Sequence, residues 1–126
     1  MYWQFRPKTD TYVQLGCDED HLALHFNPRF KDDTDGAVLV CNSKMDGCWG
    51  HEEREKHMTG FLSPFSLQIV LKLTGDVFEV EMPNGHVIKF PNRHVLEVIT
   101  YVRIRGDLNN PNDYIITDLI SHVLIL

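Results

Sequence analysis

The chain has 126 residues and a formal net charge of −6 at pH 7, with 43% hydrophobic and 24% charged residues. This length suits one domain with its own core, and the composition is ordinary for a globular protein. An acidic chain argues against binding to a nucleic-acid backbone or an anionic membrane surface, because such proteins carry clustered positive charge. A neutral ligand is therefore the simplest expectation.

The predicted elements are short strands separated by turn residues. They span residues 12–15, 21–27, 37–42, 51–56, 65–73, 77–82, 87–90 and 97–104. Loops are expected at 16–20, 31–36, 43–48 and 106–112, and Asn84-Gly85 is the strongest hairpin signal. Because no segment has a sustained helical period, the pattern indicates an antiparallel two-sheet sandwich.

The strand at 21–27 shows which face is buried. Its apolar side carries Leu22, Leu24 and Phe26, while His25 and Asn27 lie on the other side. Pro28 lacks a backbone donor, so we expect a strand end or an edge position there.

A second polar row follows at 51–56, where Glu52 and Arg54 share one face and Trp49 precedes them. An exposed tryptophan beside histidine, asparagine, arginine and glutamate side chains indicates a recognition surface.

Three blocks in this order resemble a known family. They are His25-Phe26-Asn27-Pro28-Arg29, then Asn42, then Trp49-Gly50-x-Glu52-x-Arg54. Their residue types and spacing resemble the carbohydrate-recognition signature of the galectins, the β-galactoside-binding lectins. Further similar stretches are Val40-Cys41-Asn42-Ser43 and Phe90-Pro91-Asn92-Arg93, and the resemblance extends over residues 5–107.

The resemblance implies an all-β, jelly-roll-like sandwich with sugar on the concave sheet, formed by residues 1–126 as a single domain. It also implies that the partners are glycans and glycoproteins containing β-galactosides such as lactose or N-acetyllactosamine. No cofactor and no metal is expected. The implied carbohydrate-binding residues are His25, Asn27, Arg29, Asn42, Trp49, Glu52 and Arg54.

The chemistry of galactose agrees with this set. Its axial hydroxyl at C4 leaves a patch of C–H groups on one ring face, which Trp49 could cover. The resemblance implies that His25, Asn27 and Arg29 converge on O4, that Asn42 and Glu52 take O6, and that Arg54 reaches the neighbouring sugar. If His25 bonds the sugar as a neutral ring, affinity should drop below about pH 6.

Both ends of the chain depart from the family pattern. The usual N-terminal strands have no counterpart before residue 5, and residues 108–126 diverge. We expect residues 114–126 either to add a strand or to dock over the gap. Because terminal strands form the two-fold edge of many galectins, these changes argue against the usual homodimer.

Two other readings stay open. A galectin-like module without sugar binding would serve as an interaction or structural protein. A hydrolase would use Glu52 or Glu53 with His51, but glycosidases need two carboxyl groups about 5–10 Å apart, and Glu52 beside two arginines should stay ionised. We therefore expect no enzyme and no catalytic residues, since neither a nucleophile motif nor a metal-ligand spacing is visible.

The cysteine content and the N-terminus bear on the compartment. Cys17, Cys41 and Cys48 are odd in number, which favours reduced thiols in a cytosolic protein, with Cys41 filling the core. The first seven residues contain no apolar run of secretory-signal length, and no run approaches the roughly 18 residues of a membrane span. The family resemblance adds the expectation of non-classical secretion and no membrane insertion.

Overall fold

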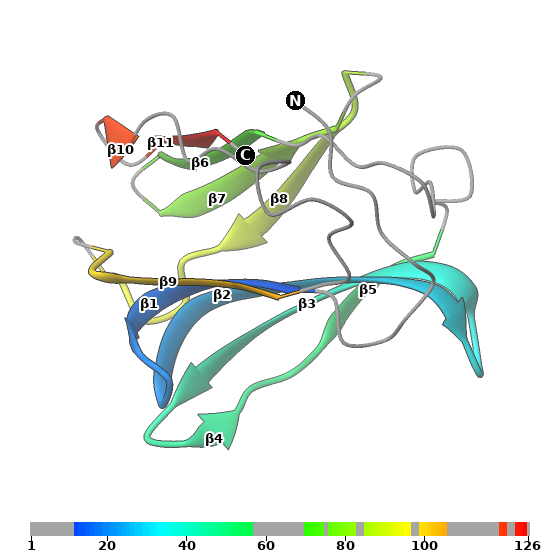
Figure 1. Cartoon of the computed structure of the whole chain (residues 1–126), viewed down its shortest axis with the longest axis horizontal. Coiled ribbons are helices and arrows are strands. Elements are labelled where there is room, and N and C mark those ends of the chain that lie inside the picture. Colours follow the sequence, from blue (N-terminus) through cyan, green and yellow to red (C-terminus); the bar gives the residue numbers. More distant parts are fainter. Residues whose placement is uncertain are drawn as a thin grey trace.

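A computed structural model describes residues 12–56, 70–74, 76–82, 85–96, 99–105, 119–120 and 123–125. The described strands form two antiparallel sheets that lie one above the other (Figure 1). The predicted all-β fold of two antiparallel sheets is confirmed, and no helix occurs in these ranges. None of these residues therefore belongs to a helix of membrane-spanning length and apolarity.

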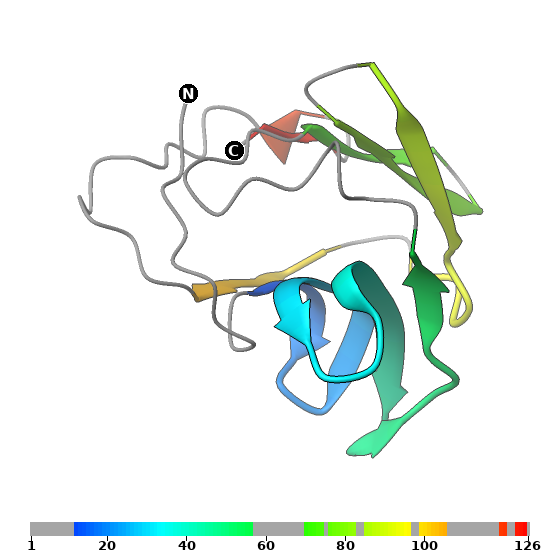
Figure 2. The ribbon, with the colours of Figure 1, turned by 90° about the vertical axis from the view of Figure 1, so that its right-hand side faces the viewer.

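The first sheet has the order β4-β3-β2-β1-β9, and β5 also pairs with β3. Its strands are β1 (Tyr12–Asp18), β2 (His21–Asp32), β3 (Gly36–Met45), β4 (Cys48–Trp49), β5 (Glu53–Glu55) and β9 (Tyr101–Arg105). Figure 2 shows the same two layers from the side, with the connection between β2 and β3 nearest the viewer.

The second sheet has the order β10-β11-β6-β7-β8. Its strands are β6 (Val70–Thr74), β7 (Val77–Glu81), β8 (Val87–Pro91), β10 (Leu119–Ile120) and β11 (Val123–Ile125). Of the two alternatives for the C-terminal residues, the structure has the added strand: β11 pairs with β6. The predicted strand residues 65–69 lie outside the described ranges.

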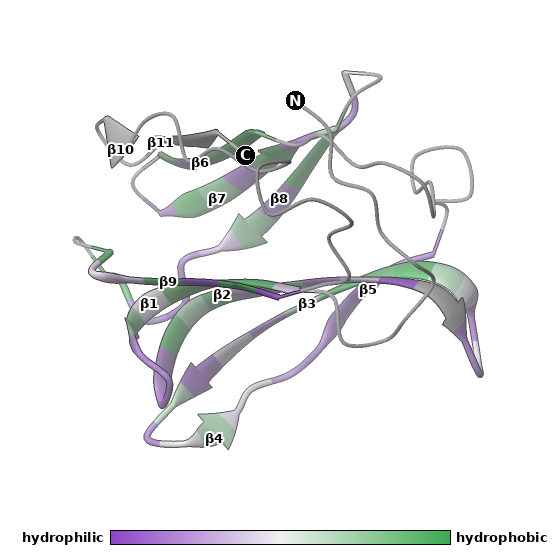
Figure 3. Cartoon of the chain, in the orientation of Figure 1, coloured by the Kyte–Doolittle hydropathy of each residue, from purple (hydrophilic) through white to green (hydrophobic). Residues whose placement is uncertain are grey.

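The core lies between the sheets because the strands alternate apolar and polar residues at a period of two. In β7, Phe78 and Val80 are buried, with Glu79 and Glu81 on the opposite face. Both sheets contribute to the cluster, which includes Val13, Leu15, Leu24, Phe26, Leu39, Cys41, Leu71, Phe78, Val80 and Phe90. Figure 3 shows green, apolar bands along strands of both sheets.

Of the two alternatives for Pro28, the strand end is wrong, whereas an edge position fits the strand pairing within the described residues. β2 continues to Asp32, and Pro28 pairs with Leu39 of β3. On the other side of β2, the pairing with β1 ends at Phe26 opposite Val13. The missing donor of Pro28 is therefore tolerated because the residue lies beyond the β1 ladder.

One predicted turn region is shorter in the structure, and the predicted hairpin is present. The loop at 43–48 contracts to a turn at Asp46 and Gly47, both with positive φ of 50° and 76°, because β3 runs on to Met45. The Asn84-Gly85 hairpin signal is confirmed by the antiparallel pairing of β7 and β8, with Gly85 at a φ of 87°. Glycine is favoured there because its positive φ carries no Cβ clash.

Candidate functional site

A cavity of about 360 Å³ opens on the first sheet, on the face opposite the core. Its lining comes from β2, β3, β4 and the link from β4 to β5, namely His25, Arg29, Val40, Asn42, Trp49, Gly50 and Glu52. Most of the residues predicted from the sequence thus lie together. Asn27 and Arg54 do not line the cavity but hold residues that do.

The cavity lies where the strand pairing is interrupted between β4 and β5. Both strands pair with the same edge of β3, and the link between them leaves that ladder. Here the Gly50 amide donates to the Ser43 carbonyl at 2.8 Å, and Asn42 Nδ2 donates to the Gly50 carbonyl at 3.0 Å. A Cβ on Gly50 would lie 2.9 Å from Arg93 Nη1 and 3.2 Å from Asn42 Oδ1. Glycine is therefore favoured here, because a Cβ would force the end of the Arg93 side chain to shift.

His25 lines the cavity from β2. Gln14 Nε2 donates to His25 Nδ1 at 3.0 Å, so the neutral ring carries its proton on Nε2. The ring packs against Tyr12 at 5.2 Å and edge-on against Trp49 at 4.9 Å between centroids. The tautomer therefore leaves an N–H donor on the side of the ring away from Gln14.

Burial lowers the pKa of His25 from its ordinary value to about 4, and the positive charges of Arg29 and Lys44 add to the effect. The ring is thus uncharged near neutral pH.

Trp49 lies at the rim of the cavity with 49% of its surface exposed. The Lys44 ammonium lies 5.0 Å from the centre of the indole, and His25 contacts the ring from the side. An indole that is held in position and still half exposed offers a flat apolar surface to a ligand.

A cluster around His21 fixes the turn that leads into Trp49. His21 Nδ1 lies 2.8 Å from Asp18 Oδ1, and Nε2 lies 3.0 Å from Asp46 Oδ1. These two carboxylates raise the pKa of His21, because both ring nitrogens donate only in the protonated form. The Gly47 amide adds a bond to the Asp20 carbonyl at 3.1 Å, so the β1–β2 and β3–β4 turns are joined.

Arg29 is held by polar groups on three sides. Its Nε donates to Asn27 Oδ1 at 2.8 Å, its Nη1 donates to Asp32 Oδ1 at 3.0 Å, and its Nη2 lies 3.9 Å from Glu52 Oε1. Asn27 is only 3% exposed, so it acts from beneath the cavity. The bond from Arg29 leads the effects that lower the pKa of Asp32 to about 2.

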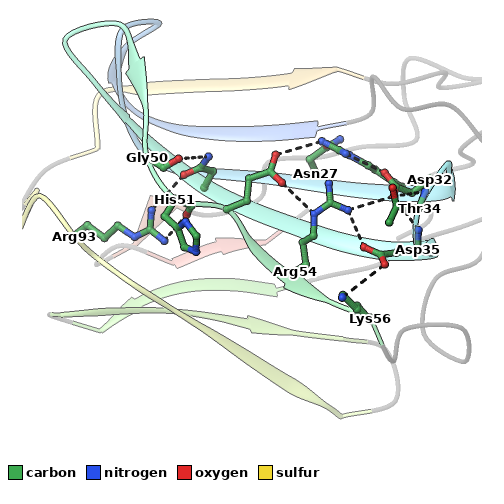
Figure 4. A network of polar contacts seen from close by, with 12 residues as sticks. Asn27, Asp32, Thr34, Asp35, Gly50, His51, Arg54, Lys56 and Arg93 are labelled. Atoms are coloured by element: carbon green, nitrogen blue, oxygen red, sulfur yellow. Dashed lines mark hydrogen bonds and ion pairs between the residues drawn. The ribbon is translucent and has the colours of Figure 1, made fainter.

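Arg54 continues the same network (Figure 4). Its Nη1 donates to Asp35 Oδ2 at 2.9 Å and to Asp32 Oδ2 at 3.2 Å, while its Nε donates to Glu52 Oε2 at 3.1 Å. The bond to Asp35 is the main reason that the pKa of Arg54 is raised. The planar guanidinium groups of Arg29 and Arg54 bridge the carboxylates of Asp32, Asp35 and Glu52, and we call this ion-pair network the lattice. It orients Glu52 toward the cavity.

Two residues that support the site had no assigned role in the sequence analysis. Asp32 joins both arginines of the lattice. Arg93 reaches from beyond β8 to donate to the His51 carbonyl at 2.7 Å and to Ser43 Oγ at 3.1 Å (Figure 4). The only hint of Arg93 in the sequence analysis was the family resemblance of the stretch Phe90-Pro91-Asn92-Arg93. That resemblance does not indicate which residues Arg93 contacts.

Within the described ranges, no group of three or more histidine, cysteine or acidic side chains is arranged to hold a metal ion. Cys41 is buried, which raises the pKa of its thiol to about 12, and Cys17 and Cys48 are exposed. The expectation that Cys41 fills the core is confirmed.

Comparisons with known proteins agree with this geometry. Residues 5–110 match the family model described as galactoside-binding lectin. The chain is 41% identical to galectin-1 of Capra hircus over 75% of this chain and 70% of that protein. A crystal structure of chicken galectin 2 has a TM-score of 0.73 and 37% identity, covering 85% of this chain and 79% of that one.

A complex of toad ovary galectin with thio-digalactose has a TM-score of 0.69 and 30% identity, covering 79% of this chain and 74% of that one. The family match spans most of the chain, and the fold agrees with it. The protein therefore belongs to the galectins, the family of galactoside-binding lectins.

Proposed function

We propose that the cavity binds β-galactosides of the lactose and N-acetyllactosamine type, and that the protein is a lectin and not an enzyme. The observation that carries this proposal is the pairing of the half-exposed indole of Trp49 with the oriented polar groups of the same cavity. A pyranose needs both features, because its C–H face is apolar and its hydroxyl edge must be matched by donors and acceptors.

Each side chain has a distinct part in the proposal. Trp49 stacks on the C–H face of galactose, and the axial O4 lies between the Nε2 proton of His25 and Arg29, which Asn27 holds in place. Asn42 and Glu52 take O6. Arg54 orients Glu52 and faces the neighbouring glucose or N-acetylglucosamine.

The rigidity of the lattice bears on selectivity. Each net hydrogen bond contributes only about 0.5–1.5 kcal/mol, so we expect a dissociation constant between about 1 mM and 1 μM. A sugar without the axial hydroxyl would leave fixed donors unpaired, at roughly 1–3 kcal/mol each. Discrimination against glucosides should therefore be stronger than the modest affinity suggests.

Retention on lactose–agarose tests the proposal directly. We expect the protein to be retained and to elute with lactose but not with sucrose. Calorimetry with N-acetyllactosamine at millimolar excess should detect heat. Folded protein that passes through the column and gives no heat would favour the alternative of a galectin-like interaction module, whereas release of product from a chromogenic galactoside would indicate a hydrolase.

The pH dependence of lactose binding gives a further prediction. Because the pKa of His25 is lowered to about 4, the ring stays neutral as the pH falls and gains its proton only near that value. Affinity should be constant from about pH 5 to 8 and should drop as the pH approaches 4. This replaces the expectation of a drop below about pH 6, which assumed an ordinary histidine.

The His21→Gln variant is the control for that profile, since the pKa of His21 is raised and its cluster adjoins the turn before Trp49. If lactose affinity of the wild-type protein changes with pH above pH 6 and this change is absent in His21→Gln, the change is assigned to His21. A drop centred near pH 6.5 that persists in the variant would contradict the neutral state of His25.

We further propose that the partners are galactoside-bearing glycoproteins, and that the protein is made in the cytoplasm and exported by a non-classical route. The first part follows from the site, and the second from the family resemblance. The oligomeric state is measured separately, by size-exclusion chromatography of the protein with and without lactose.

A further inference from the structure

The turn that follows β8 contains an unusual backbone conformation, and we call residues 92–96 the Asn92 turn. Val95 has a φ of 51°, in the left-handed region, and 65% of its surface is exposed. A β-branched residue is disfavoured at positive φ, because its side chain crowds the backbone. Since Val95 gains little burial in this position, other contacts must hold the conformation.

Asn92 provides these contacts. It is only 5% exposed, its Oδ1 accepts from the Leu96 amide at 3.2 Å, and its Nδ2 donates to the Leu96 carbonyl at 2.9 Å. The Val95 amide donates to the Asn92 carbonyl at 3.1 Å, and the Asn92 amide donates to the Asp76 carbonyl at 2.7 Å. Because Asp76 lies between β6 and β7, the Asn92 turn is fixed to the second sheet.

Arg93 joins the Asn92 turn to the first sheet. Its guanidinium carbon lies 4.7 Å from the centre of the Phe90 ring, which is fully buried in β8. Its Nη2 donates to the His51 carbonyl at 2.7 Å, and Figure 4 shows the side chain pointing from the second sheet toward His51. Trp49 and Glu52 lie on either side of this contact in the chain. The guanidinium therefore braces the segment that carries the exposed indole and the cavity carboxylate.

Arg93 also fixes the amide of Asn42, which lines the cavity. Asn42 Oδ1 accepts from the Ser43 amide at 2.8 Å and from Arg93 Nη1 at 3.3 Å. Asn42 Nδ2 donates one of its two protons to the Gly50 carbonyl at 3.0 Å. A flipped amide would turn its NH₂ group against the guanidinium, so Asn42 offers the cavity a donor and not an acceptor.

We propose that the Asn92 turn is a positioning element of the galactose cavity, in which Asn92 holds the strained turn and Arg93 is the positioning residue for Trp49, Glu52 and the amide of Asn42. This inference rests on the proposed function. Neither Asn92 nor Arg93 lines the cavity, so both act through other side chains and the backbone. The shape of a site on the first sheet thus depends on a turn that belongs to the second sheet.

Lactose titration of Arg93 variants tests the positioning role. Arg93→Met keeps the length of the side chain but loses its donors, and it should weaken lactose binding by about threefold to tenfold. Arg93→Lys should recover part of the affinity, because the ammonium keeps the charge opposite Glu53, which lies 3.5 Å from Arg93 Nη2. Lys89→Met is the matched control, since it removes the same charge from an exposed position on β8 and should leave the affinity unchanged.

A second measurement needs no sugar. Trp3 and Trp49 are the two tryptophans of the chain, so a Trp3→Phe background makes the fluorescence report on Trp49 alone. Acrylamide should quench this fluorescence more efficiently in Arg93→Met than in the parent, because the segment after Trp49 loses its brace. Quenching in Lys89→Met should equal that of the parent.

Three further variants separate positioning from stability. Val95→Asn should raise the thermal midpoint and leave lactose affinity unchanged, since asparagine tolerates positive φ. Asn92→Ala should weaken lactose binding as Arg93→Met does, although Asn92 does not line the cavity. Val80→Ala destabilises the core of the second sheet without touching the Asn92 turn, and the affinity of the folded protein should stay that of the wild type.

The outcomes keep this inference apart from the proposed function. Lactose binding by the wild type, with unchanged affinity and quenching in both Arg93→Met and Asn92→Ala, would overturn the positioning role alone. A loss of affinity in Val80→Ala as large as that in Arg93→Met would also overturn it, because general destabilisation would then explain both. Folded wild-type protein that binds no lactose would refute the proposed function, and the quenching comparison would still decide whether Arg93 holds Trp49 in place.

Discussion

Trp49→Ala should abolish retention on lactose–agarose while leaving the fold intact. Removal of the indole uncovers the apolar face of the sugar, which costs on the order of 2–3 kcal/mol, or roughly thirtyfold to a hundredfold in dissociation constant. The effect on stability should be at most about 1 kcal/mol, because the side chain is 49% exposed. Calorimetry with lactose and thermal unfolding measure the two quantities separately.

The Trp49→Phe variant is the matched control for stacking. A smaller ring should keep part of the affinity, because it still covers some of the C–H surface. Unchanged lactose affinity in Trp49→Ala, with circular dichroism like that of the wild type, would show that the indole does not contact the sugar.

Arg29→Ala should lower both lactose affinity and stability, unlike the change at Trp49. The guanidinium bonds buried Asn27 at 2.8 Å and Asp32 at 3.0 Å, so its loss disturbs the lattice as well as the cavity. A bond with a charged donor contributes about 1.5–3 kcal/mol, and we expect a destabilisation of that order together with at least tenfold weaker binding. Urea unfolding and lactose titration on the same preparation provide the measurement.

Arg29→Lys distinguishes charge from geometry. Lysine keeps the positive charge but cannot reproduce the planar fork between Asn27 and Asp32, so stability should recover more than lactose affinity does. Full recovery of affinity in the lysine variant would show that only the charge matters. Wild-type affinity in Arg29→Ala would remove Arg29 from the site.

Ion pairs hold the arginines of the candidate site in place. Between Arg29 and Arg54, the cations are fixed by Asp32, Asp35 and Glu52. Fixed groups discriminate well because they cannot adapt to a wrong epimer.

Local patterns predicted much of this protein from its residues alone. The alternation in β2 placed Leu24 and Phe26 in the core and His25 on the polar face, as the structure shows. Cys41 was likewise expected in the core, and it joins the core cluster. Side-chain direction in a strand depends only on position along the chain, so these assignments need no knowledge of partners.

Features that depend on partners were missed. The strand passes through Pro28 because the β1 ladder has already ended, which no residue near Pro28 reveals. Leu22 is buried, as the alternation predicted, but Ala23 and not Leu22 joins the core cluster with Leu24. A register shift between β1 and β2 at Leu15 and Gly16 lies beside it, and such irregularities break the period of two.

The sequence by itself determined the alternating faces and the family, and it predicted most of the residues that line the cavity, because each depends on residue type and short-range spacing. Only the tertiary structure decided that Arg93 supports Asn42 and Ser43 across about fifty intervening residues, that Asp32 joins Arg29 to Arg54, and that His25 is neutral. The physical reason is that ion pairing and desolvation depend on which groups the folded chain brings together, and local spacing does not contain that information.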